Sequence, residues 1–192
     1  NACGDPPVPV GGDQSPPTTE GGALRSQAFR RAAGEPVTLD GSIIRVNPDT
    51  GDAMPDNPAA GDANANRRRI VAYGFRNPFR FTFRPGTSEL WMGDVGWNTW
   101  EEVNRLPNTT TLRNFGWPCY EGQGRQPSYD ALNVNLCESL YSAGTAVGPW
   151  FQYNHGDDFG TCGAGTSSPT GITFYTGSQF PSTYRNALFV AD

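Results

Sequence analysis

Turn-forming residues divide this chain into runs that are too short for long helices. Its 192 residues include 24 glycines and 17 prolines, the two residue types least favourable inside a helix. The clearest run is Phe79–Arg84, in which every second residue is phenylalanine, so the three rings would share one face of a strand. A turn at Pro85–Thr87 and a returning strand at Glu89–Gly93 complete a predicted hairpin. The pattern predicts an all-β fold, which leaves a sandwich, a barrel or a propeller open.

Further strand candidates recur at short intervals along the chain. They are Ser42–Asn47, Ile70–Tyr73, Glu102–Leu106, Asn114–Trp117, Pro149–Tyr153, Gly171–Tyr175 and Ala187–Ala191. Residues 79–117 would hold four strands in meander order, which is the size of one propeller blade. This rhythm favours a propeller. At about 45 residues per blade the chain supplies at most four blades, and its long loops reduce that to about three. A closed ring needs four to eight, so we expect part of a larger protein.

The first part of the chain differs from the rest. Residues 1–36 are rich in proline and glycine and show no apolar period. They are predicted to form a loop-rich insertion or tail, with at most a short helical turn around Leu24 and Phe29. Residues 37–192 are predicted to form part of a β-propeller domain. We expect no membrane span, because no run of 18 apolar residues occurs.

Charge and residue usage exclude several functional classes. The formal net charge of −5 argues against a nucleic-acid binder, which normally presents a basic face. All 14 basic residues are arginine, so the chain has no lysine to act as a Schiff base. His155 is the single histidine, which nearly excludes a Ser-His-Asp triad or a multi-histidine zinc site built from this chain alone.

The four cysteines include one pair suited to a disulfide. Cys119 and Cys137 lie in one stretch rich in glycine, asparagine and proline, and no cysteines form a CxxC motif. A loop-closing disulfide there would contribute on the order of 3 kcal/mol; the alternative is a pair of buried thiols. We favour the disulfide because loops seldom bury free thiols. It would imply an oxidising compartment, hence a secreted or periplasmic protein.

A first polar motif is the stretch Gly74–Pro78, of sequence GFRNP. Pro78 favours an extended backbone at Asn77 and so restricts the direction of the Arg76 side chain. An arginine held in this way can present its planar guanidinium to a carboxylate or an o-quinone. The alternative is an arginine that pairs with a nearby aspartate at a blade edge.

A second polar motif, GDVGWNTWEE at residues 93–102, is rich in hard oxygen donors. The side-chain donors are Asp94, Asn98, Glu101 and Glu102, and Gly96 would let backbone carbonyls approach an ion. Ligands that are all oxygen favour calcium over zinc or copper. The alternative is a polar turn with solvated acids.

In combination, these motifs resemble the glucose/sorbosone dehydrogenase family. The resemblance rests on GFRNPFRFTFRPGTSELWMGDVGWNTWEEVNRL followed by NFGWPCYEG, with SIIRVNPDTG and DNP upstream. It covers residues 36–122 most strongly, and YNHG and GITFYTG look like actinobacterial members. The resemblance implies a six-bladed propeller of four-stranded antiparallel sheets with long loops. It also implies the cofactors pyrroloquinoline quinone (PQQ) and calcium.

The resemblance assigns roles to individual residues. Arg76 and Asn77 match a pair at the quinone and substrate pocket, so they are predicted to be catalytic and cofactor-binding. Gly96 and Trp97 match two positions whose backbone carbonyls hold the calcium ion beside the quinone, although Trp97 replaces the family's usual proline. Glu102 matches an acid of the motif and is assigned to support of that loop or to a secondary metal contact.

The resemblance implies that the larger protein, of which this chain would be a part, oxidises a sugar, an aldose, by hydride transfer to PQQ. The sequence does not identify the electron acceptor. The family's general base is a histidine in an earlier blade, which His155 does not match. We interpret His155 as a loop histidine that hydrogen-bonds its neighbours, and expect no turnover from this chain alone.

Two alternatives stay open. The same motifs resemble Hedgehog-interacting-protein-like proteins, so a non-catalytic extracellular propeller that binds a partner is possible. The other is a structural propeller that retains only the calcium loop.

Overall fold

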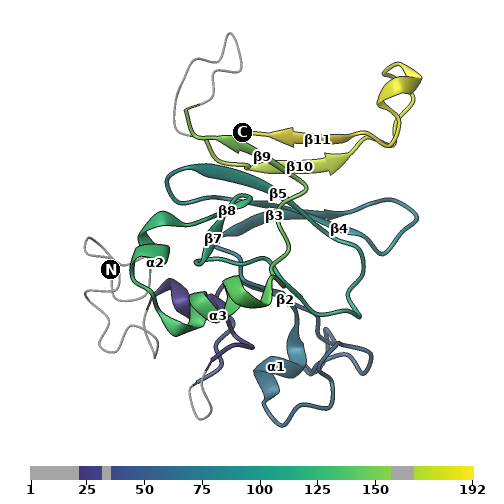
Figure 1. Cartoon of the computed structure of the whole chain (residues 1–192). Helices are drawn as coiled ribbons and strands as arrows, with labels where there is room; N and C mark the ends of the chain where they lie inside the picture. Colours follow the sequence, from purple (N-terminus) through teal and green to yellow (C-terminus); the bar gives the residue numbers. More distant parts are fainter. Residues whose placement is uncertain (1–21, 32–35, 157–166) are drawn as a thin grey trace. The chain divides into compact units, whose positions relative to one another are not determined.

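The predicted hairpin is the centre of a four-stranded antiparallel sheet. In the computed structural model, which describes residues 22–31, 36–156 and 167–192, this sheet has the strand order β3-β4-β5-β9. Its strands are β3 (Pro78–Phe83), β4 (Leu90–Asp94), β5 (Trp100–Leu106) and β9 (Phe151–Asn154), as Figure 1 shows. The turn that joins β3 to β4 falls where proline and glycine predicted it. Each of the four strands overlaps a strand candidate of the sequence, β9 with Pro149–Tyr153 included.

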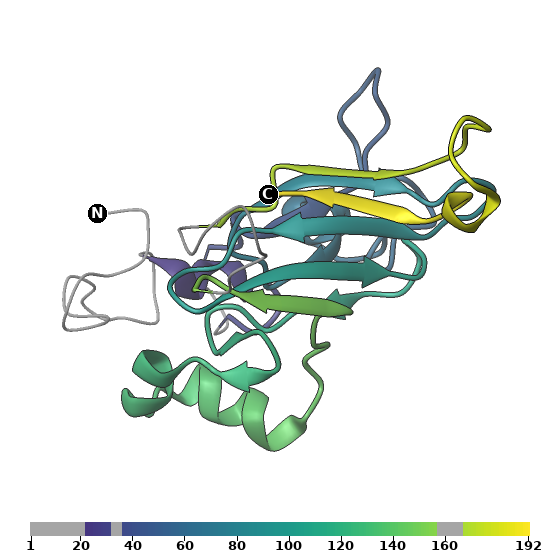
Figure 2. The same cartoon turned by 90° about the horizontal axis from the view of Figure 1, so that it is seen from above.

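The prediction that the segment Asn114–Trp117 forms the fourth strand of this sheet was wrong. Instead of completing the meander, Asn114 lies in β6 (Arg113–Asn114), which pairs in parallel with β2 (Ile70–Tyr73). The place beside β5 is taken by β9, with Val103 opposite Phe151, and Figure 2 shows β9 (green) alongside the teal strands. The chain thus leaves the sheet after β5 and returns only with β9. Alternation predicts that a strand exists, but not which neighbour it pairs with.

The chain divides into two compact units. The first unit comprises Asn1–Arg76 and Thr109–Gly148, and the second comprises Asn77–Asn108 and Pro149–Asp192. Most of the predicted loop-rich segment, residues 1–21 and 32–35, lies outside the described residues. The boundary expected near residue 36 therefore stays a prediction.

In its described residues, the first unit contains a small mixed sheet, three short α-helices and one 3-10 helix. Strand β1 (Ser42–Ile44) pairs antiparallel with β2, and all four residues of β2 are buried. The other elements are η1 (Ala23–Ser26), α1 (Ala65–Arg69), the hairpin β7 (Tyr120–Glu121) and β8 (Gly124–Arg125), α2 (Pro127–Ala131) and α3 (Asn135–Ala143). The helical turn expected around Leu24 is present as η1. Helix α3 ends at Gly144 in the left-handed conformation, a common helix stop.

The second unit adds a two-stranded antiparallel sheet to the four-stranded one. Its strands are β10 (Gly171–Phe174) and β11 (Leu188–Ala191), with η2 (Ser182–Tyr184) between them. Its core packs Trp91 of β4 and Val103 of β5 against Phe174. The prediction of a mostly β chain is confirmed. Within the described part of the chain, none of the helices has the length and apolar character needed to cross a membrane.

Three tyrosines should resist ionisation in the folded protein. Burial raises the pKa of Tyr73, Tyr141 and Tyr153 above the usual value near 10, and the Tyr153 hydroxyl also donates to Asp192 Oδ1 at 3.0 Å. The folded state holds these protons more tightly than the unfolded state. The three tyrosines therefore contribute their full stabilisation below pH 10, and the free energy of unfolding should fall as the pH rises above that value. We expect a tyrosinate absorbance titration to show a later rise in the native protein than in urea. Coincident curves would contradict this.

Candidate functional site

Asn77, one residue of the predicted quinone pair, lies where β3 begins, against the end of β4. Its backbone N–H donates to Asp94 Oδ1 at 2.6 Å, and its carbonyl accepts from the N–H of Val95 at 3.0 Å. Asp94 is only 3% exposed, so its carboxylate is a buried acceptor for the backbone rather than a solvated acid. The structure therefore brings Asn77 together with the start of the segment 95–99, which joins β4 to β5.

Glu101 binds the segment 95–99 through its backbone. Glu101 Oε2 accepts a 2.9 Å hydrogen bond from the N–H of Gly96, and the glutamate is fully buried. Gly96 and Trp97, the predicted calcium ligands, thus lie in a short connection that is held from inside the sheet. Trp97 is half-buried and Asn98 is exposed.

The second oxygen of Glu101 faces the only histidine. Glu101 Oε1 lies 2.8 Å from His155 Nε2, and the backbone N–H of His155 donates to Thr99 O at 3.0 Å. His155 comes directly after β9, so it reaches this position because β9 pairs with β5. His155 is thus a loop histidine that hydrogen-bonds Thr99 through its backbone and whose ring faces a buried carboxylate.

Glu101 has a larger structural role than the sequence predicted. It is one of the four side-chain oxygen donors of the motif GDVGWNTWEE, but the resemblance assigned the role of supporting the loop to Glu102. Glu102, on the opposite face of β5, accepts a hydrogen bond from Asn104 Nδ2 at 2.9 Å, so its assigned role stays a prediction. The available signal was a pair of adjacent acids at the start of a predicted strand, because a carboxylate that becomes buried requires a partner.

The oxygen-rich chemistry of this segment fits a calcium ion. Backbone carbonyls and carboxylates are the donors that calcium prefers, and the buried contact from Glu101 holds the segment that carries two of those carbonyls. Across residues 22–31, 36–156 and 167–192, no three His, Cys, Asp or Glu side chains gather to hold a metal. A site of the predicted kind uses main-chain oxygens instead.

Arg76, the other residue of the predicted pair, is the last residue of the first unit. Its guanidinium carbon lies 5.9 Å from the centroid of the Trp117 ring, a cation–π distance. The preceding residue, Phe75, is fully buried and stacks on Phe115 with centroids 4.5 Å apart. Arg76 therefore follows a rigid aromatic core, and its side chain lies over a tryptophan of the NFGWP motif.

A buried polar network holds that motif in place. Gln27 and Asn114 exchange two side-chain hydrogen bonds, of 3.0 and 2.8 Å. Gln27 Nε2 also donates to Trp117 O at 2.7 Å, and the Ser26 hydroxyl donates to the same oxygen at 2.6 Å. Sequence reasoning missed this network because the partners are 87 positions apart.

Gly74 is required by this arrangement. It has a φ of +81°, and a Cβ there would lie 2.3 Å from Asn114 Oδ1. Its carbonyl accepts from the N–H of Trp117 at 2.8 Å. Gly74 of GFRNP thus permits the NFGWP motif to approach closely. This approach brings the Trp117 ring against the guanidinium of Arg76.

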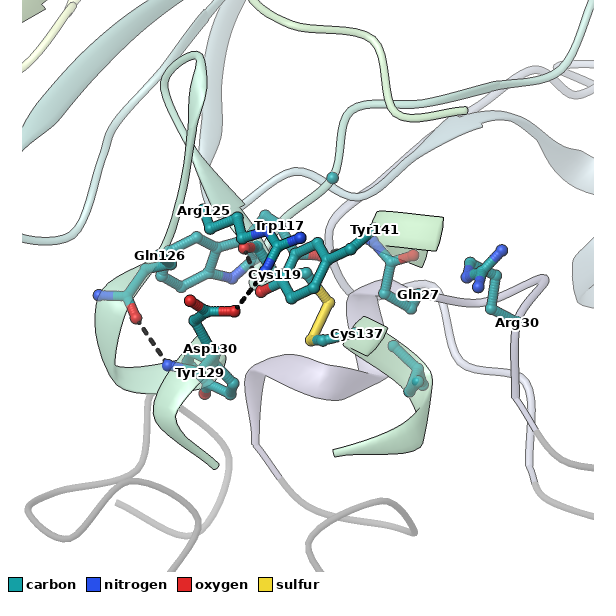
Figure 3. Close-up of a disulfide and its surroundings, with 12 residues drawn as sticks. Gln27, Arg30, Trp117, Cys119, Arg125, Gln126, Tyr129, Asp130, Cys137 and Tyr141 are labelled. Carbon is teal, nitrogen blue, oxygen red and sulfur yellow. Dashed lines mark hydrogen bonds and ion pairs between the residues drawn. A yellow bond between two sulfur atoms is a disulfide. The ribbon is translucent and has the colours of Figure 1, made fainter. Parts of the chain in front are cut away.

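The predicted disulfide between Cys119 and Cys137 is confirmed. It joins the residues after NFGWP to helix α3, as Figure 3 shows, and both cysteines are fully buried. Tyr141 of α3 donates from its hydroxyl to Cys119 O at 2.8 Å. The disulfide is consistent with an extracytoplasmic protein. Cys3 and Cys162 lie outside the described residues.

Comparison with known proteins gives one family match. The model of the family described as Glucose / Sorbosone dehydrogenase matches residues 22–192. The match therefore includes both units, the disulfide and every residue to which the resemblance assigned a role.

Individual relatives are distant and longer. Aldose sugar dehydrogenase YliI from Escherichia coli (strain K12) is 26% identical over 168 residues, covering 88% of this chain and 40% of the relative. An uncharacterized protein from Borreliella burgdorferi is 28% identical over 137 residues, covering 66% of this chain and 30% of that protein. A solved glucose dehydrogenase structure matches 88% of this chain and 40% of its own with a TM-score of 0.56 at 24% identity, which shows the fold alone. The chain spans less than half the length of each.

Proposed function

Since the chain belongs to the glucose/sorbosone dehydrogenase family, we propose that the full-length protein oxidises an aldose by hydride transfer to PQQ, with calcium bound. The family and its aldose sugar dehydrogenase relative support the general reaction, which is dehydrogenation of a sugar. The observation that carries the assignment of PQQ and calcium is the position of Asn77. Its backbone is hydrogen-bonded to the two residues that precede Gly96.

The proposal gives each predicted residue a role. Arg76 and Asn77 bind and orient the quinone and the sugar, and the guanidinium of Arg76 stabilises negative charge that develops on oxygen during the reaction. The carbonyls of Gly96 and Trp97 hold calcium, and Glu102 supports their segment. Bound PQQ would supply the hydride acceptor, and bound calcium would supply a Lewis acid that polarises the quinone carbonyl. We assign the proton-accepting base to no residue of this chain, because His155 is engaged with buried Glu101.

We place the protein outside the cytoplasm, in the periplasm or secreted. The support is the Cys119–Cys137 disulfide, because such crosslinks persist in oxidising compartments. Its substrate is a small sugar in that compartment.

The test is reconstitution of the full-length protein. After treatment with a chelator, it should reduce an artificial dye in the presence of an aldose only when both PQQ and calcium are restored. Magnesium in place of calcium is the control and should support less activity, because magnesium demands a stricter octahedral geometry. Absence of aldose-dependent dye reduction with any sugar tested would refute the proposal and favour the non-catalytic binding module.

A further inference from the structure

The connection between β4 and β5 is held at its start by the side chain of Glu101 and at its end by the backbone of His155. At its start, the N–H of Gly96 donates to Glu101 Oε2 at 2.9 Å. At its end, the carbonyl of Thr99 accepts from the backbone N–H of His155 at 3.0 Å. The two holding residues meet each other, with Glu101 Oε1 2.8 Å from His155 Nε2. The carbonyls of Gly96 and Trp97 lie between these two fixed points.

The energetic importance of this pair follows from its burial. Glu101 is fully buried, and the His155 side chain is 22% exposed. The hydrogen bond from the Gly96 N–H to the Glu101 carboxylate is of the charge-assisted kind, which is stronger than one between neutral groups. Both Glu101 oxygens face a nitrogen, one from the loop and one from the residue after β9. The Glu101 carboxylate reaches His155 only when β9 is paired with β5, so the contacts that hold the loop depend on that pairing.

We propose that Glu101 is a positioning residue for the calcium-binding carbonyls of Gly96 and Trp97, and that His155 completes its hold on the segment. The inference rests on the proposed function, in which these carbonyls bind calcium. Glu101 fixes the N-terminal side of the segment and His155 the C-terminal side, so the two carbonyls are preorganised before the ion arrives. Residues that orient metal ligands in this way typically contribute 10- to 100-fold to metal affinity.

The test is a calcium titration of the full-length protein by calorimetry, with and without PQQ. Glu101→Ala should raise the Kd for calcium by about 10- to 100-fold. Glu101→Gln keeps an acceptor for Gly96 and should restore most of the affinity. His155→Ala removes the imidazole that faces Glu101 Oε1 but keeps the backbone N–H that donates to Thr99 O. It should raise the Kd by a smaller factor, because the Glu101–Gly96 and His155–Thr99 hydrogen bonds both survive.

Glu89 offers a matched control. It is an acid just before the other end of β4, paired with Arg105 and with Arg84, roughly 16 Å from Asp94 along an extended strand. Glu89→Ala removes the same charge and should leave the calcium Kd unchanged.

Two negative results have different meanings. If the unsubstituted protein binds no calcium, the proposed function fails and the inference with it. If that protein binds calcium and both Glu101→Ala and His155→Ala bind it equally well while folded by circular dichroism, the inference alone is overturned.

Discussion

Replacing Arg76 by alanine should lower the turnover of the full-length protein by about 10²- to 10³-fold, the usual cost of removing one preorganised donor from a developing charge. The protein should remain folded, because the guanidinium lies 5.9 Å from the centroid of Trp117 and such a contact contributes about 0.5–1 kcal/mol at an accessible site. The measurement is aldose-dependent dye reduction at saturating PQQ and calcium, combined with urea unfolding. Turnover should fall much more than stability.

Arg80→Ala is the matched control for this prediction. Arg80 also lies over an aromatic ring, at 4.5 Å from the centroid of Phe79, but the resemblance gives it no role. Its removal should leave turnover unchanged. If Arg76→Ala and Arg80→Ala have equal turnover, the role assigned to Arg76 is wrong.

Removing the Cys119–Cys137 crosslink should lower the free energy of unfolding by about 3 kcal/mol. The crosslink restricts the unfolded chain, and in the folded state it joins the NFGWP segment to helix α3. Urea unfolding of Cys119→Ala, Cys137→Ala and the double variant measures the effect. Because either substitution abolishes the same bond, the double variant should lose little more than each single one.

A second outcome of the same experiment tests the connection to the site. The segment that the disulfide holds includes Trp117, over which Arg76 lies, but Gln27 and Ser26 hold the carbonyl of Trp117 independently. The double variant should therefore retain turnover under conditions in which it is folded. A double variant that unfolds at the same urea concentration as the parent would contradict the stability prediction.

Local features of the chain were predictable and distant partners were not. The β3–β4 hairpin follows from alternation and from the turn residues between its strands, and the position of β2 follows from a short apolar run. The pairing of β5 with β9 does not, because the intervening residues 107–150 carry their own elements. The same limit applies to Gln27 with Asn114 and to Glu101 with His155, whose side chains meet only because of the fold.

The candidate site divides in the same way. Arg76 and Asn77 were identified through a motif of adjacent residues, and so were Gly96, Trp97 and Glu102. The residues that hold these segments depend on partners that the motifs do not connect: Asn114 bonds Gln27, and Glu101 faces His155. A sequence motif indicates the groups that touch a ligand more readily than the buried polar partners that fix their positions.

The late return of β9 has a consequence during synthesis on the ribosome. Until residues 151–154 have emerged, β5 is an open edge whose backbone N–H and C=O groups can pair with strands of other chains. Glu101 also lacks His155 throughout that interval, since the histidine follows β9. A nascent chain that stalls within residues 107–150 should therefore be prone to aggregation, and protection of that edge by a chaperone would matter most at this stage.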